Sequence, residues 1–162
     1  MSTIHPAAAD AALDLTITRL LRAPRAQVWQ AWADPALLKE WWCPKPWVTD
    51  VRAFDMHPGG AFHTFMSGPD GGTSDNPGCF LEVVPQERIV ITSMLVGGWR
   101  PATPWMPFTA RFTLADEGDG TRYTATGMHP DTATRDKHAE MGFHEGWGIC
   151  IDQLEALAQR LR

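Results

Sequence analysis

Alternating apolar and polar positions mark the first part of the chain and most of its middle. Leu13, Leu15 and Ile17 alternate with polar residues, which is the period of two that is typical of a half-buried β-strand. The same pattern recurs six times between turn-forming segments, so neighbouring strands should pair as antiparallel hairpins. The six further strands are predicted at residues 48–56, 61–66, 79–84, 89–96, 108–114 and 121–128.

Two short helices are predicted between the first and second strands. Pro24 suits the first position of a helix, and Val28 and Trp32 belong to its apolar stripe. Asp34 can cap a second helix over residues 35–40. Among the later connections, we expect residues 67–78 to form a solvated loop, because glycine, proline, aspartate and serine dominate them.

A long helix is predicted over residues 131–161. Projected at 100° per residue, its apolar residues fall on one broad face that should pack on the sheet. Glu140 lies on this face and His144 on its edge, whereas His138 projects to the opposite side and should be exposed to solvent. Three glycines near residue 145, among them Gly142, call for a close backbone approach or a local bend.

The order of elements predicts an α+β fold in which helices cover one face of an antiparallel sheet. A chain of 162 residues fits one domain, which we place at residues 13–162, after a flexible N-terminal tail at residues 1–12. Some 30 helical residues would extend for about 45 Å and could lie across the whole sheet.

Composition and charge exclude several classes of function. The net charge is −5 and the basic residues are scattered, so we expect no nucleic-acid partner. No apolar run approaches the roughly 20 residues that span a bilayer, and the first residues lack the features of a secretory signal. We therefore expect no integral membrane contact. Three cysteines without a ligand-like spacing predict neither disulfides nor a zinc site, which favours the cytoplasm.

Five separated motifs follow one another along the chain, at residues 22–42, 55–60, 78–89, 120–122 and 141–147. They include the pair Trp41 and Trp42, and the Pro-Gly-Gly turn after His57. Together they resemble the START-like superfamily of polyketide cyclases and lipid-transport proteins (SRPBCC), within it the branch named for activators of the ninety-kilodalton heat-shock protein ATPase. The resemblance implies a helix-grip fold, in which a curved antiparallel sheet grips a long C-terminal helix around a cavity. One position departs from the pattern, because His57 replaces the usual arginine.

The aromatic and methionine residues near the sheet and the helix would, by themselves, be assigned to a core. With the resemblance, we expect part of them to line a cavity that binds a hydrophobic or amphipathic small molecule. Successive side chains of a strand point to opposite faces of the sheet, so not all of these residues can face the cavity. Phe62 and Phe65, for example, are three residues apart and should point to opposite faces. The candidate ligand-binding residues are Trp42, Trp47, Phe62, Phe80, Met94, Trp99, Phe112, Met128, His129, Met141, His144 and Trp147.

Two other functions stay open at this point. Glu140 precedes His144 by one helical turn, so its carboxylate could orient the imidazole as a general base in an enzyme of the cyclase or hydrolase type. The same pair could equally be a structural contact. By the resemblance, the chain could also be an interaction module that acts on a chaperone ATPase.

The remaining predictions concern cofactors, metals and assembly. No phosphate-binding glycine loop or dinucleotide fingerprint occurs, and we predict no cofactor. His57, His63, His129 and His144 lack a recognisable ligand spacing, so no metal site is predicted. A homodimer through the sheet edge or the tryptophan-rich loops stays open, since eight tryptophans can exceed the needs of one core.

Overall fold

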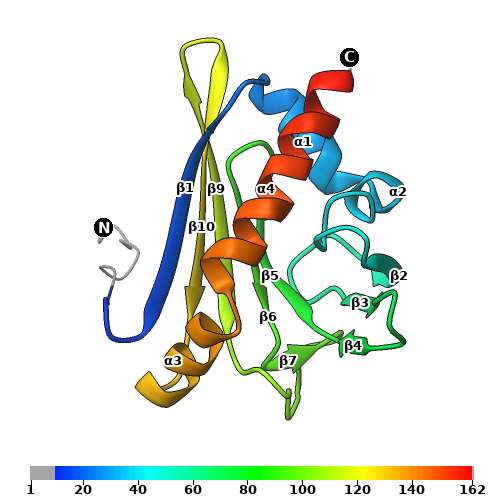
Figure 1. Ribbon diagram of the computed structural model, residues 1–162, viewed down its shortest axis with the longest axis vertical. Helices are drawn as coiled ribbons and strands as arrows, with labels where there is room; N and C mark the ends of the chain where they lie inside the picture. The colour runs from blue at the N-terminus through cyan, green and yellow to red at the C-terminus, as the bar shows by residue number, and fades with distance from the viewer. Residues whose placement is uncertain (1–9, 162) are drawn as a thin grey trace.

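An antiparallel sheet of five strands curves around one long helix, α4 (Figure 1). The computed structural model describes residues 10–161. The strand order is β1-β10-β9-β6-β5, and β1 pairs with β10 along its whole length. The bounds are Asp14–Leu21 for β1, Cys79–Val84 for β5, Arg88–Thr92 for β6, Thr109–Glu117 for β9 and Gly120–Met128 for β10.

A smaller sheet extends this curve beyond β5. It has the order β2-β3-β4, with β2 at Val48–Phe54, β3 at Phe62–Ser67 and β4 at Thr73–Asn76. A bridge between Ala61 and Cys79 joins the two sheets. The prediction of a solvated loop over residues 67–78 was therefore wrong in part. Strand β4 has no apolar alternation, because it is a short polar edge strand that exists by pairing its backbone with β3.

The predicted strand at residues 89–96 is divided into β6 and a short β7, Leu95–Val96, which pairs with β8, Arg100–Pro101. The ladder is interrupted at Ser93. Its hydroxyl donates to the Met106 carbonyl at 2.6 Å and accepts from the Phe108 backbone N–H at 3.0 Å. A side-chain hydroxyl thus replaces a ladder hydrogen bond here, which the apolar pattern could not indicate.

The two short helices after β1 are confirmed. They are α1, Arg25–Ala33, and α2, Pro35–Leu38, which ends two residues before the predicted end. The Asp34 carboxylate accepts a hydrogen bond from the Ala36 backbone N–H at 2.9 Å and so caps α2. Trp32 of α1 is completely buried and fixes the helix to the sheet.

The C-terminal helix is broken, contrary to the prediction of one helix over residues 131–161. Helix α3 covers Thr132–Glu140 and α4 covers Phe143–Arg160, and Gly142 between them has φ +91°. Glycine adopts this left-handed conformation without steric cost. Gly142 is thus the local bend that the glycine cluster called for. The 18 residues of α4 extend about 27 Å rather than 45 Å.

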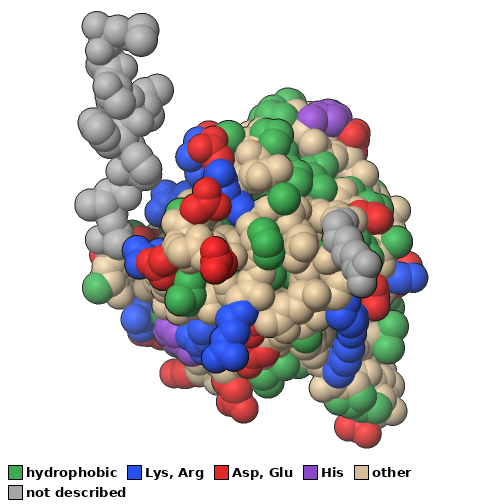
Figure 2. All heavy atoms as spheres, turned by 90° about the horizontal axis from the view of Figure 1, so that it is seen from above, with side chains coloured by type: hydrophobic (Ala, Val, Ile, Leu, Met, Phe, Trp, Pro, Cys, Tyr) green, Lys and Arg blue, Asp and Glu red, His purple; other side chains and the backbone are tan. Residues whose placement is uncertain are grey.

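The N-terminal tail lies mostly outside the described residues, which begin at residue 10. Asp10 starts a turn in which its carbonyl accepts from the backbone N–H groups of Leu13 and Asp14. In the part of the chain from residue 10 to residue 161, no helix is long and apolar enough to cross a membrane. On the face drawn in Figure 2, lysine and arginine side chains are interspersed with aspartate and glutamate.

Candidate functional site

A cavity of about 450 Å³ lies between the sheet and the two C-terminal helices. Small-molecule sites have volumes of roughly 300–1,000 Å³ and predominantly apolar walls, and this cavity fits both criteria. It is open to solvent at one end. Its walls are formed by Trp41, Trp42, Phe62, Thr64, Met66, Ile91, Thr92, Phe108, Phe112, Tyr123, Ala125, His138, Trp147, Cys150 and Ile151, and its mouth by Ser74 to Gly78, Ser93 and Thr103 to Met106.

Four of the predicted ligand-binding residues meet on the walls. Phe112 of β9 and Trp147 of α4 stack with their ring centroids 5.8 Å apart and their planes 13° apart. Trp42 and Phe62 meet edge to face at 5.1 Å. These four side chains come from β3, β9, α4 and the segment after α2, so only the fold brings them together.

Tyr123 lies on the most buried part of the wall. Its hydroxyl accepts a hydrogen bond from Trp32 Nε1 at 2.8 Å, and both side chains are fully buried. Burial raises the pKa of Tyr123 far above its ordinary value, so the phenol stays neutral. This end of the cavity therefore holds a neutral hydroxyl group among aromatic rings.

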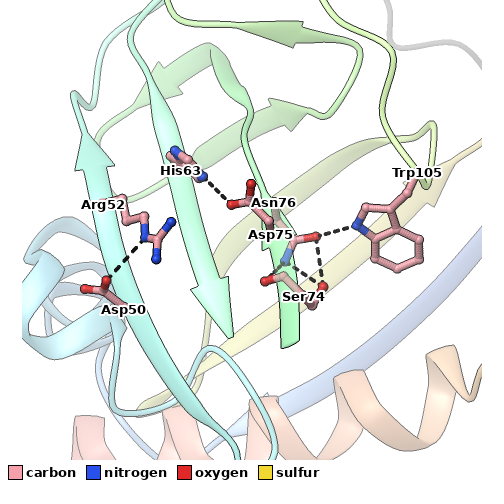
Figure 3. A network of polar contacts seen from close by, with 7 residues as sticks. All are labelled: Asp50, Arg52, His63, Ser74, Asp75, Asn76 and Trp105. Carbon is pink, nitrogen blue, oxygen red and sulfur yellow. Dashed lines mark hydrogen bonds and ion pairs between the residues drawn. The ribbon is translucent and has the colours of Figure 1, made fainter. Parts of the chain in front are cut away.

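Strand β4 and the loop before β9 form the mouth. Figure 3 shows the polar contacts that join these two segments. Trp105 is half exposed, and its Nε1 donates to Asn76 Oδ1 at 3.1 Å. Asn76 in turn donates to the backbone carbonyl and the hydroxyl of Ser74. Asp75 turns to His63 on β3, with 2.5 Å between the carboxylate and the imidazole.

A chain of hydrogen bonds links His138 to the backbone of the turn before β1. His129 Nδ1 lies 2.7 Å from the Leu13 carbonyl, and its Nε2 lies 2.8 Å from His138 Nδ1. His138 is only 8% exposed and lines the cavity. Burial is the larger cause and the neighbouring His129 the smaller, and together they lower the pKa of His138 to about 4. His138 is therefore neutral at pH 7.

The prediction that His138 is exposed was wrong. It assumed a single straight helix, whereas the break at Gly142 gives α3 its own axis. The same break separates the proposed pair of Glu140 and His144. Glu140 ends α3 and is exposed, and His144 in the first turn of α4 is exposed and donates from Nε2 to the Thr16 carbonyl at 3.1 Å. Neither residue lines the cavity.

The other predicted ligand-binding residues also lie outside the main cavity. Phe80 is fully buried behind Phe62, with 5.0 Å between the ring centroids. A second hollow is lined by Met94, Met128 and His129. The remaining three, all partly exposed on the surface, are Trp47, Trp99 and Met141.

In the part of the chain that the structure describes, the cysteines and histidines form no metal centre. Within residues 10–161, no group of three or more histidine, cysteine, aspartate or glutamate residues is arranged to hold a metal ion. Cys150 lines the cavity, but burial raises the pKa of its thiol to about 12. Burial also raises the pKa of Cys43. Both thiols therefore stay protonated and are weak nucleophiles.

Comparison with known proteins agrees with this architecture. A crystal structure of a Nitrosomonas europaea protein has a TM-score of 0.89 and 48% identity, covering 94% of this chain and 97% of that one. A Mycobacterium smegmatis protein has a TM-score of 0.78 and 29% identity, covering 93% of each chain. A solution structure from Arthrobacter aurescens has a TM-score of 0.80 and 25% identity, over 93% of this chain and 88% of that one.

The match to a family model covers most of the sequence. No match was found among curated proteins. A family model described as Activator of Hsp90 ATPase homolog 1-like protein matches residues 22–159, which include both short helices, the whole sheet after β1 and nearly all of α4. The solved relatives share the same sheet and long C-terminal helix, as the START-like resemblance implied. The chain belongs to the Activator of Hsp90 ATPase homolog 1-like family and has its helix-grip fold.

Proposed function

We propose that this protein binds a hydrophobic or amphipathic small molecule in the cavity between the sheet and the C-terminal helices. The observation that carries the proposal is the unfilled space of about 450 Å³ behind the aromatic walls of Phe112 and Trp147. Protein interiors are normally packed to the density of organic crystals. A space of this size among aromatic side chains, with an open mouth, is typical of a ligand site.

The apolar walls can supply useful affinity. A ligand that buries about 300 Å² of apolar surface gains roughly 7 kcal/mol at about 25 cal/mol per Å². The loss of translational and rotational freedom offsets part of this gain. We therefore expect dissociation constants between about 10 μM and a few millimolar for simple aromatic compounds.

Native mass spectrometry of gently purified protein tests the proposal first. We expect an excess mass of a few hundred daltons that disappears on denaturation, or, for a protein purified without ligand, saturable binding of 2-methoxynaphthalene in a calorimetric titration. Ala125→Leu should abolish either form of binding, because Ala125 is a fully buried wall residue and the added carbons occupy the cavity. Ala115→Leu is the matched control, since Ala115 is exposed in β9. Equal binding by both variants would contradict the proposal.

The family name supports a second candidate, an interaction with the ninety-kilodalton chaperone ATPase. The test is the rate of ATP turnover by that chaperone with and without an excess of this protein. An unchanged rate would remove the candidate. The enzymatic alternative has no comparable support, because His144 and Glu140 lie outside the cavity. A cytoplasmic location and a homodimer stay predictions, and the same native mass spectra report the oligomeric state.

A further inference from the structure

We propose that Nε2 of His138 is a hydrogen-bond acceptor that the cavity offers to its ligand, and that the ligand is an uncharged apolar molecule carrying an O–H or N–H group. This inference rests on the proposed function and specifies the chemical class of its ligand. It also assigns a role to His138, which the sequence pattern had placed on the surface.

The backbone of Leu13 sets the direction of the hydrogen-bond chain. A carbonyl oxygen only accepts, so His129 must carry a proton on Nδ1 to bond to Leu13 at 2.7 Å. In a neutral ring its Nε2 is then an acceptor, and His138 Nδ1 must donate to it across 2.8 Å. The proton of neutral His138 is therefore on Nδ1. Its Nε2 keeps a free lone pair.

This lone pair is not sealed inside the protein. Within residues 10–161, Nε2 of His138 makes no hydrogen bond, since His138 bonds to His129 through Nδ1. The one fully buried side-chain nitrogen or oxygen without a partner in these residues is Arg135 Nε, so Nε2 of His138 is not fully buried. Nε2 must therefore border open space, and the open space beside His138 is the cavity. Phe108, Phe143 and Trp147 hold the imidazole edge to face, with centroids 5.1 Å, 5.2 Å and 6.0 Å away. The acceptor thus has a fixed orientation.

The charges around the cavity select against ionised ligands. No lysine or arginine lines it in the described part of the chain, and the one charged residue found there, Asp75 at the mouth, is paired with His63. A carboxylate would lose its hydration without gaining a counterion, which is strongly unfavourable. His138 supplies no positive charge at pH 7, because burial holds its pKa at about 4. A neutral donor group is the chemistry that matches this site.

Calorimetric titration with three probes of one size tests the inference. The probes are 2-naphthol, which donates a hydrogen bond, 2-methoxynaphthalene, which cannot donate, and 2-naphthoate, which is an anion at pH 7. We expect 2-naphthol to bind roughly tenfold more tightly than 2-methoxynaphthalene, in line with the value of one hydrogen bond. Binding of 2-naphthoate should be the weakest of the three.

The variant His138→Asn removes the acceptor Nε2 and keeps a donor to His129. The amide nitrogen of asparagine can replace Nδ1 as donor to His129, while nothing replaces Nε2. The variant should bind 2-naphthol and 2-methoxynaphthalene with equal affinities, because the acceptor that distinguishes the two probes is gone. His57→Asn is the matched control, because His57 is exposed and lies outside the cavity. It should behave as the wild type.

The tautomer can be measured without any ligand or variant. Nitrogen-15 NMR of the wild type at pH 7 should show His138 protonated on Nδ1, and a proton on Nε2 would overturn the inference. Equal affinities for 2-naphthol and 2-methoxynaphthalene would also overturn it, while leaving the proposed function intact. If the wild type binds none of the probes and carries no ligand in native mass spectra, the proposed function fails and this inference falls with it.

Discussion

The two ends of helix α4 face the same sheet but have different surroundings. The C-terminal half packs on α1, and its apolar residues Leu154, Leu157 and Ala158 are almost completely buried. The N-terminal half carries Trp147, which borders the cavity. Both halves are rich in apolar residues, so composition does not distinguish a filled core from a cavity. The difference is that α1 packs on one end of the helix, whereas at the other end the equally long α3 leaves the space beside Trp147 open.

The largest expected effect comes from removing an aromatic side chain at the filled end. Trp32→Ala should lower the free energy of unfolding by about 4 kcal/mol, because it leaves a cavity and deprives the Tyr123 hydroxyl of its partner. Trp147→Ala should cost only about 1–2 kcal/mol, since one side of that ring already faces open space. Urea unfolding of both variants, followed by circular dichroism, gives the two values. Similar losses would mean that the two ends are packed alike.

The next largest expected effect is a pH dependence of the free energy of unfolding, which arises from His138 beside the cavity. The pKa of His138 is about 4 in the folded protein against an ordinary 6.5, so between these values the unfolded chain binds a proton that the folded chain does not. Stability should therefore be intact above pH 6.5 and fall by up to about 3 kcal/mol as the pH drops to 4.

His138→Asn isolates this contribution from the other titrating groups. Urea unfolding at a series of pH values should give a flatter profile for the variant than for the wild type between pH 6.5 and 4. Parallel profiles would show that the buried imidazole is protonated as easily in the folded chain as in the unfolded one.

The smallest expected effect is on stability and concerns the boundary between the two C-terminal helices. Gly142→Ala should cost about 1 kcal/mol, because alanine is strained at φ +91°. Gly146 lies inside α4, and an added Cβ there meets open space, so Gly146→Ala should stabilise the protein by up to about 1 kcal/mol. Thermal unfolding compares the pair. A stabilising effect at both positions would mean that α3 and α4 can join into one helix.

Much of the fold followed from local patterns. Alternation of apolar residues located β1, β3, β5, β9 and β10, and Pro24 and Asp34 located the starts of the two short helices. Strand β4 was missed, because a polar edge strand is stabilised by its partner rather than by its own pattern. The end of α3 was missed as well, since a glycine cluster indicates a bend without showing which glycine adopts the left-handed conformation.

The candidate site was predictable only in its aromatic part. Trp42, Phe62, Phe112 and Trp147 were predicted from residue type and the family resemblance, and they lie together on the walls. His138 and Trp105 were missed. The orientation of His138 depends on the axis of α3, and that of Trp105 on a hydrogen bond to Asn76 from a strand 29 residues earlier. The family was identified correctly from motifs that are local in the sequence.

Sequence by itself determined which segments become strands and helices, and to which family the chain belongs, because alternation, capping and motif order are read over a few neighbouring residues. Only the tertiary structure decided which aromatic residues fill a core and which border a cavity, and which histidine faces it. The physical reason is that an empty space depends on the distance between elements far apart in the chain. A single glycine with φ +91° changes the direction of α3, and with it the side of the molecule to which His138 belongs.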